Sequence, residues 1–136
     1  MAILLDRVFN AQTEALAAVR NAVRTACQQA GCSEECSEQV VLAINEACMN
    51  VIQHGYSFAG GAAFKLQMRL ENGLLTVHLL DNALPVGDAD LRPRALEELR
   101  PGGLGVRFMR ELMDGVVYVQ APEGFVNCLQ LSKRVY

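Results

Sequence analysis

The stretch "KLQMRLENGLLTVHLLD", residues 65–81, decides the fold. Its first half alternates apolar with polar side chains, which is the period-2 pattern of a strand with one buried face. Asn72 and Gly73 in its middle form the pair that a two-residue hairpin turn prefers, because both tolerate a positive φ. The second half resumes as a strand that pairs back on the first. We therefore predict an antiparallel hairpin.

Asp81 ends this hairpin in step with Leu75, Val77 and Leu79, and therefore on the side of the pleat that we expect to face the core. A carboxylate in such a place needs a partner. A structural reading stands beside this one, because an aspartate at a strand end often caps a turn and "DN" at residues 81–82 is suited to begin one.

The totals of the 136-residue sequence favour one globular domain over residues 1–136, with 51% hydrophobic and 20% charged residues. A net charge of −3 does not indicate binding to nucleic acid or to an anionic membrane surface. No apolar run of the sequence approaches the roughly 20 residues of a membrane span. The five cysteines are odd in number and irregularly spaced, and no secretory signal precedes them, which favours a reduced cytoplasm. Cys32 and Cys36 suggest a metal clip, but small residues near a helix start are the simpler reading.

Two helices are predicted before the hairpin, after a short apolar strand at residues 3–9. Apolar residues recur every three or four positions over 15–30, and Gly31 is placed to end that helix. Ser33, followed by two glutamates, is typical of an N-cap with acids in the first turn. The second helix is expected to run to about His54, with Gly55 ending it.

Residues 82–101 have no strand pattern, and loops of this length are usually functional lids or disordered. A third helix follows, and then strands at 116–120 and 125–133. Because both pairings are hairpins, the sheet should be mostly antiparallel, with helices on one face if Thr76 and His78 stay on the other. The fold class is α+β, a two-layer α/β sandwich. The third helix places the following residues at core spacing: Leu104, Phe108, Met109, Leu112 and Met113.

Polar residues form a stripe on the second helix, with Glu46, Asn50 and His54 four apart and Gln39 in line with them. Taken alone, such a stripe is more often a solvated face. The glycines at 102, 103 and 105 allow either phosphate binding at a helix start or a flexible loop. Neither a Rossmann fingerprint nor a Walker A loop fits, because no strand precedes the glycines and no Gly-Lys-Ser/Thr follows them.

The order of these signals resembles the GHKL ATPase superfamily with its Bergerat nucleotide-binding fold, and more closely the bacterial anti-sigma factor serine kinases. "LAINEACMNVIQHGY" at 42–56 is similar to the N-box helix of that family. "GGLGVRFMRELMDGVVY" at 102–118 is similar to its second glycine box with the helix and strand that follow. The resemblance covers essentially the whole chain, including "LQLSKRV" at 129–135.

The resemblance implies a role for each matching position. Asn50 would hold Mg²⁺ that bridges the ATP phosphates, and Glu46 would be catalytic, orienting or deprotonating the attacking hydroxyl. Asp81 would accept from the adenine amino group. His54 would support the site by packing. The positions implied to approach the nucleotide at the glycine boxes are Ala83, Gly102, Gly103, Leu104 and Gly105.

The sequence departs from the family pattern at several of these positions. The family usually has glycines two and four residues after the adenine-binding aspartate, where this chain has Ala83 and Pro85. A threonine on a late strand often contacts the adenine side, and the nearest polar candidate here is Asn127. The segment 82–101 has no lysine, which leaves arginines, Arg100 among them, as phosphate partners or as solvated side chains.

The function implied by the resemblance is an ATP-dependent serine-protein kinase and anti-sigma regulator in a partner-switching system. Its partners would be a STAS-domain anti-anti-sigma protein and a sigma factor, and it would be a homodimer without direct contact to nucleic acid or membrane. The alternative, motivated by Ala83 and Pro85, is a nucleotide-dependent binding module with weak or no catalysis. A detached sensor histidine kinase domain fits less well, because its dimerisation helices would precede residue 1.

Overall fold

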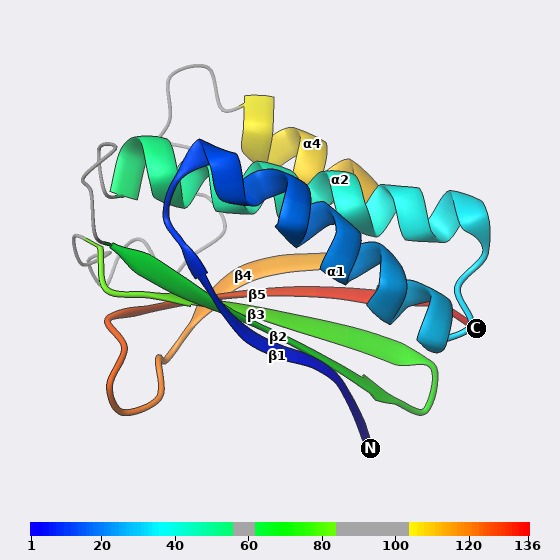
Figure 1. Ribbon diagram of the computed structural model, residues 1–136. Coiled ribbons are helices and arrows are strands. Elements are labelled where there is room, and N and C mark those ends of the chain that lie inside the picture. The colour runs from blue at the N-terminus through cyan, green and yellow to red at the C-terminus, as the bar shows by residue number, and fades with distance from the viewer. Residues whose placement is uncertain (56–61, 84–103) are drawn as a thin grey trace.

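The computed structural model describes residues 1–55, 62–83 and 104–136. Figure 1 shows a sheet overlaid by helices, in the order strand, two helices, two strands, helix and two strands, as predicted. In chain order the elements are β1 (Ala2–Asn10), a 3-10 turn (Thr13–Ala15), α1 (Leu16–Gln29), α2 (Glu34–Asn50), a π-helical turn (Val51–Gly55), β2 (Ala63–Glu71), β3 (Leu74–Asp81), α4 (Leu104–Leu112), β4 (Gly115–Val119) and β5 (Asn127–Arg134).

The five strands form one antiparallel sheet in the order β1-β2-β3-β5-β4. The central hairpin is the predicted one, and its turn residues Asn72 and Gly73 have φ of 51° and 78°. Both angles are positive, as a two-residue turn requires for its twist to match that of the strands. The register then continues from β2 and β3 to β5, where Asp81 lies opposite Asn127.

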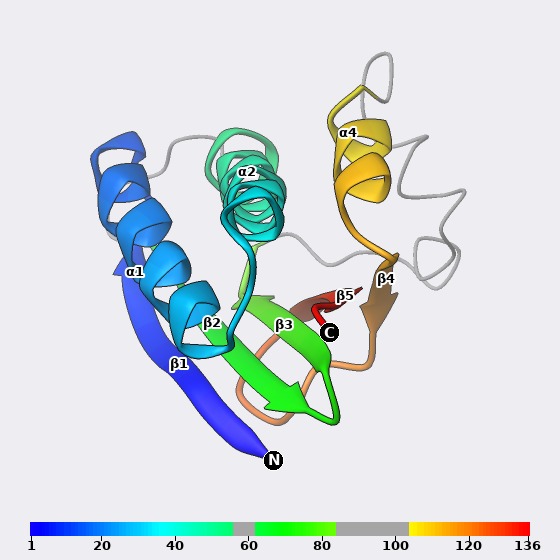
Figure 2. The same ribbon diagram turned by 90° about the vertical axis from the view of Figure 1, so that its right-hand side faces the viewer.

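The helices lie on one face of the sheet, with α2 between α1 and α4 (Figure 2). The apolar core fills the space between the two layers, and burying it supplies most of the driving force for folding. The opposite face keeps Thr76 and His78 half-exposed, as expected, and the His78 Nε2 atom hydrogen-bonds with Gln130 Oε1 at 2.9 Å. None of the helices in the described part of the chain is long and apolar enough to span a membrane.

The joint between α1 and α2 is fixed by a cap on each helix. Gly31 has φ of 82°, and its amide donates to Gln28 while the next amide, of Cys32, donates to Cys27. This pair of bonds is a Schellman motif, which ends a helix with glycine in the left-handed region. Ser33 begins α2, because its Oγ accepts from the Cys36 amide at 3.0 Å. Both predicted helix boundaries are confirmed.

Side chains also join the two helices along their length. The Arg24 guanidinium forms an ion pair with Glu38 through Nε at 2.9 Å, and Arg20 Nη1 donates to Asn45 Oδ1 at 3.0 Å. The Arg24 pair is largely exposed and contributes little to stability on its own. The pairs matter here because they identify the side of α2 that faces α1.

The structure corrects three details of the sequence-based expectations. The α-helical part of α2 ends at Asn50, and the chain continues through a π turn rather than through further α-helix. Phe108 is 41% exposed and does not belong to the core, although Met109 and Met113 do. It lies about 100° around the helix from Met109, outside the stripe that reaches the sheet. The strand β5 begins at Asn127 rather than at 125. The segment 82–101, for which a lid was one expectation, lies almost entirely outside the described residues.

The turn glycine of the hairpin yields a stability prediction with an internal control. A Cβ at Gly73 would lie 2.6 Å from the Tyr136 carbonyl oxygen, whereas a Cβ at Gly31 would meet nothing within 4 Å. Gly31→Ala should therefore cost only the strain of the left-handed backbone, about 1–2 kcal/mol. Gly73→Ala carries the same strain plus the clash, so its loss in urea unfolding should be larger by about 1 kcal/mol or more. Equal losses in the two variants would contradict the turn geometry.

Candidate functional site

Asp81 is the buried acidic residue around which the site is built. It ends β3 and is 6% exposed, with Phe64 of β2 opposite it on one side and Asn127 of β5 on the other. Its position in step with Leu75 and Leu79, which are buried, places its side chain on the helix-covered side of the sheet. This confirms the side of the pleat that the sequence predicts.

Two donors hold the carboxylate of Asp81, and both reach the same oxygen. The Ala83 amide donates to Oδ1 at 2.9 Å, and the Asn127 Nδ2 group donates to Oδ1 at 2.9 Å. The first bond is an Asx turn, so the turn-capping reading of the sequence is correct as well. Because both described donors converge on Oδ1, the carboxylate is fixed in orientation and Oδ2 is its remaining acceptor toward a ligand.

Burial raises the pKa of the Asp81 carboxyl above its ordinary value of 3.8, although the hydrogen bonds from Asn127 and from the Ala83 amide act in the opposite direction. Desolvation therefore outweighs the two hydrogen bonds. The pKa of the neighbouring Cys128 thiol is raised to about 11, first by burial and then by the charge of Asp81. A further hydrogen-bond donor, supplied by a ligand, would compensate the buried charge.

Asn82 holds the end of β3 in place, a role that the sequence analysis did not assign to it. Its Oδ1 accepts from the Val126 amide at 2.8 Å, and the same amide donates to the Asp81 carbonyl oxygen at 3.0 Å. These bonds fasten the strand end that carries Asp81 to the residue just before β5. The available signal was the Asx residue at a strand end, whose side chain readily bonds to nearby backbone.

Glu46 and Asn50 lie on the flank of α2 that is turned away from α1. Glu38 and Asn45 mark the α1 side through their bonds to arginines, and Glu46 and Asn50 project roughly 100–140° around the helix from Asn45. On that flank α2 packs against α4 (Figure 2).

The polar stripe is therefore not a solvated face. Glu46 and Asn50 are both half-buried, whereas Leu42, which lies between them and the α1 side of the helix, is 46% exposed. Gln39, the fourth member of the predicted stripe, is half-buried too. This favours the reading in which Glu46 and Asn50, at the C-terminal end of the stripe, form one wall of a site.

Leu104 and Gly105 form the first turn of α4, so the second glycine box leads into a helix N-terminus as the sequence predicts. The C-terminal end of α2, the end of β3 and the start of α4 lie toward the same side of the molecule (Figure 1). His54 belongs to the π turn after Asn50, but its side chain is not among those described. The predictions for Pro85, Arg100, Gly102 and Gly103 also lie outside the described residues.

The described residues thus supply three kinds of chemistry. Asp81, Ala83 and Asn127 make one hydrogen-bonded unit that presents a carboxylate acceptor. Glu46 and Asn50 carry side-chain oxygen atoms one helical turn apart, and such oxygens are the ligands that a hard cation such as Mg²⁺ prefers. No group of three or more metal-ligating side chains occurs within the described ranges, and Mg²⁺ that is bound mainly through phosphates does not require one. The start of α4 provides backbone amides that favour an anion.

Comparison with known proteins shows the family of the chain. The histidine kinase-like ATPase domain family matches residues 9–133. The serine/threonine-protein kinase BtrW of Bordetella bronchiseptica is 30% identical over 99 residues, which is 70% of this chain and 68% of that protein. An anti-sigma F factor of Clostridium botulinum is 32% identical over 120 residues, which is 83% of this chain and 80% of that protein.

A solved structure supports the fold separately. The crystal structure of the RsbU and RsbW domains of a Mycobacterium tuberculosis protein matches 96% of this chain with a TM-score of 0.67 and 17% identity. This chain spans 31% of that longer chain, so the likeness concerns the fold alone. The family match and the curated relatives together carry the assignment. The chain belongs to the histidine kinase-like ATPase family, among members related to anti-sigma factors and serine/threonine-protein kinases, and this membership implies that it binds ATP.

Proposed function

We propose that this protein is an ATP-dependent serine/threonine-protein kinase that acts as an anti-sigma regulator in a partner-switching system. The observation that carries the proposal is the buried Asp81 carboxylate, oriented by Ala83 and Asn127, in a fold whose α2 carries the half-buried pair Glu46 and Asn50. In this proposal Asp81 recognises the base, and Glu46 and Asn50 act on the phosphate side. Phosphoryl transfer depends mainly on such positioning and on charge neutralisation.

Asp81 is proposed to select the adenine base. An ionised carboxylate only accepts hydrogen bonds, so its remaining oxygen favours a base edge with an amino donor. A ligand amino group would also offset the cost of desolvation that raises the pKa of Asp81. Asn127 is proposed to take the part of the threonine that the family often has on its late strand, and its bond to Oδ1 keeps the carboxylate from rotating.

Glu46 and Asn50 are proposed to act at the phosphates. When bound, Mg²⁺ would neutralise phosphate charge and align the γ-phosphoryl group for attack. Asn50 would supply an oxygen ligand to it. Glu46, one turn earlier on the same flank, would accept the proton of a substrate serine hydroxyl or orient that hydroxyl. The start of α4, with Gly105 in its first turn, would direct amides at the phosphates.

The partners are proposed from the relatives. An anti-sigma F factor and a serine/threonine-protein kinase among them support a sigma factor as the sequestered protein and a STAS-type anti-anti-sigma protein as the phosphorylated one. A cytoplasmic homodimer is the assembly proposed with this function. A gene for a STAS protein or a phosphatase next to the gene for this protein would support partner switching.

The second candidate is a binding module that holds its partner without catalysis. It is favoured by Ala83 and Pro85 in the place of two glycines. At Ala83 the exchange is mild, because the residue is buried and its amide still donates to Asp81. Pro85 has no amide to donate, and it remains the reason to test catalysis directly.

The first prediction separates catalysis from binding. With ATP, Mg²⁺ and a cognate STAS protein, the wild type should phosphorylate a serine of that protein. Glu46→Gln should lower the transfer rate by about 10²–10⁴-fold, as loss of a general base does, while nucleotide affinity stays within a few fold. Asn50→Ala should weaken ATP binding in the presence of Mg²⁺. Gln39→Ala, on the same half-buried flank two turns earlier, is the matched control and should change neither quantity.

Two outcomes would decide against the kinase. ATP binding without transfer, and with no difference between the wild type and Glu46→Gln, would leave the binding module. If the protein does not bind an ATP analogue with Mg²⁺, the proposed nucleotide site is wrong and so is the kinase. If the same protein still captures a sigma factor, regulation by sequestration remains supported.

The second prediction concerns the cost of Asp81 to the protein without nucleotide. Because the pKa of Asp81 is raised, its carboxyl is better tolerated protonated, and stability is lost as pH rises through that pKa. Asp81→Asn keeps an oxygen for both donors but removes the buried charge. At pH 7 it should abolish ATP binding and raise the stability of the unliganded protein by about 1 kcal/mol, or roughly 3–5 °C in Tm.

The advantage of Asp81→Asn should vanish below pH 3.8, where the carboxyl is protonated in both the folded and the unfolded state. Asp114→Asn is the matched control, because that exposed carboxylate accepts from the Arg134 amide and its loss should not raise Tm. An Asp81→Asn variant that is less stable than the wild type at pH 7 without nucleotide would contradict the account.

A further inference from the structure

The joint between α1 and α2 brings three cysteines together as a direct result of its two caps. In the Schellman motif that ends α1, the Cys32 amide donates to the Cys27 carbonyl oxygen at 3.1 Å. This motif places the side chains of those two residues in contact. Cys32 also precedes the N-cap Ser33, whose Oγ accepts from the Cys36 amide in the first turn of α2. Cys32 therefore faces one cysteine on each helix.

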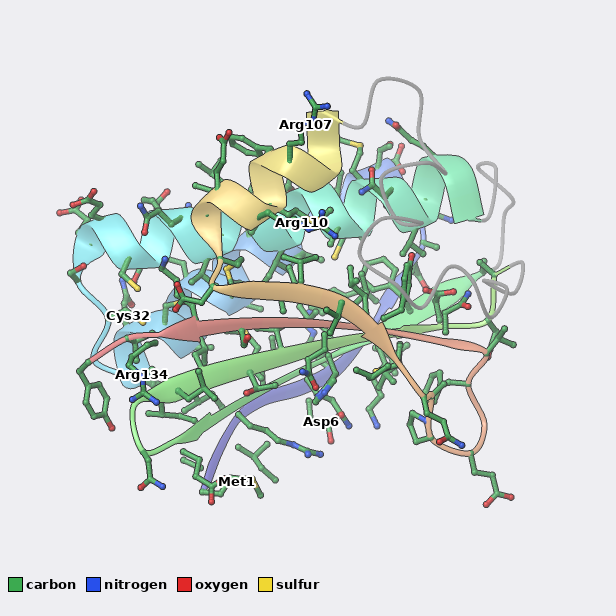
Figure 3. All side chains as sticks on the ribbon, turned by 180° about the vertical axis from the view of Figure 1, so that it is seen from behind. Met1, Asp6, Cys32, Arg107, Arg110 and Arg134 are labelled. Atoms are coloured by element: carbon green, nitrogen blue, oxygen red, sulfur yellow. The ribbon has the colours of Figure 1, made fainter. Side chains whose placement is uncertain are left out.

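The two caps bring the three thiols close enough to affect one another's pKa. The pKa of Cys32 depends on Cys27 and Cys36, and that of Cys27 depends on Cys32, Cys36 and Ser37. Cys27 is fully buried, while Cys32 and Cys36 are half-exposed, and all three are free. The cluster thus has two members that a reagent from solution can reach and one that only a neighbouring sulfur can reach. Figure 3 shows Cys32 at the end of the molecule that lies away from the grey segments.

A metal centre is not the chemistry that this cluster supports. The described residues contain no group of three or more cysteine, histidine or acidic side chains arranged to hold a metal ion. Disulfide bonding demands less, because it needs only two sulfurs whose Cα atoms lie about 4.4–6.8 Å apart. The Schellman motif draws Cys32 back to the last turn of α1, and the Ser33 cap sets Cys36 in the turn that follows Cys32.

We propose that Cys27, Cys32 and Cys36 form a thiol–disulfide exchange site in which Cys32 is a member of every disulfide formed. The co-reactant is a small-molecule disulfide such as glutathione disulfide. The thiolate of a half-exposed cysteine attacks one sulfur of the reagent, forming a mixed disulfide and releasing one glutathione thiolate. A neighbouring cysteine of the cluster, as thiolate, then displaces the second glutathione. The protein loses two electrons and two protons, and glutathione disulfide is reduced to two glutathione molecules.

The surroundings of the cluster make this exchange slow at neutral pH and faster in alkali. Burial and the neighbouring Cys36 raise the pKa of Cys32 to about 11, and burial, Cys32 and Cys36 raise that of Cys27 to about 12. The groups that face these two thiols are each other, Cys36 and Ser37, together with the Arg24 guanidinium of α1, which interacts with Cys27. Only the thiolate attacks, so the rate should rise about tenfold per pH unit between pH 7 and 9.

The exchange site lies at the opposite end of α2 from Glu46 and Asn50. Cys36 and Asn50 are separated by fourteen residues of helix, or roughly 21 Å along its axis. A disulfide within the cluster should therefore leave ATP binding within a few fold of the reduced protein. This separation makes the inference independent of the proposed kinase activity.

The test is incubation of the full-length, folded protein with glutathione disulfide at pH 8, followed by alkylation of remaining thiols and peptide mapping without reductant. We expect one intramolecular disulfide that joins Cys32 to Cys36 or to Cys27, with Cys48 and Cys128 alkylated. Cys32→Ala should abolish it, and dithiothreitol should reverse it. In 8 M urea the preference for Cys32 should disappear, because the caps that gather the thiols are lost.

Several results would overturn the proposal. A disulfide that forms at the wild-type rate in Cys32→Ala, or one that joins Cys27 directly to Cys36, would remove the central role of Cys32. Peptide mapping of the wild type alone can also contradict the proposal. Mixed disulfides with glutathione that persist would show that the thiols are not held together. Oxidation spread evenly over all five cysteines of the folded protein would show the same.

Discussion

The arrangement of the site depends on the buried carboxylate of Asp81. Burial of an acidic group is costly, and here the fold compensates it only in part, through the Ala83 amide and the Asn127 side chain. The sheet makes this possible, because the register of β3 with β5 sets Asn127 directly opposite Asp81. The raised pKa of the carboxyl indicates that these two hydrogen bonds do not fully offset the cost of desolvating its charge. Keeping such a group lowers the stability of the unliganded protein, as expected of a residue retained for the proposed ligand.

Much of the fold follows from local signals, and these were predictable. Asn72 and Gly73 set the hairpin because few other residue pairs adopt two positive φ angles at low cost. Gly31 and Ser33 mark the boundary between α1 and α2 because each satisfies backbone groups within four residues of itself. The side of the sheet on which Asp81 lies follows from alternation alone. None of these features requires knowledge of what packs against what.

The remaining features depend on contacts between distant segments, which the sequence does not reveal by itself. Helical spacing predicted that Phe108 belongs to the hydrophobic core. The way in which α4 lies over the sheet decides which neighbours of Met109 are buried, and Phe108 is not one of them. The stripe of Glu46 and Asn50 has the pattern of a solvent-exposed helix face. Its partial burial becomes evident only from the packing of α4 against α2. The partnership of Asn127 with Asp81 spans 46 residues. Only the sheet register, in which the two residues lie opposite each other, reveals it.

The most direct test of the central claim compares ATP with inosine triphosphate, which has an oxo group where adenine has its 6-amino group. Both should be titrated with Mg²⁺ into the wild-type protein by calorimetry. If Asp81 reads the base through its second oxygen, inosine triphosphate should bind about 10–100-fold more weakly, because a hydrogen bond to a charged group is replaced by two facing acceptors. Equal affinities for the two nucleotides would show that Asp81 does not read the base and would contradict the account.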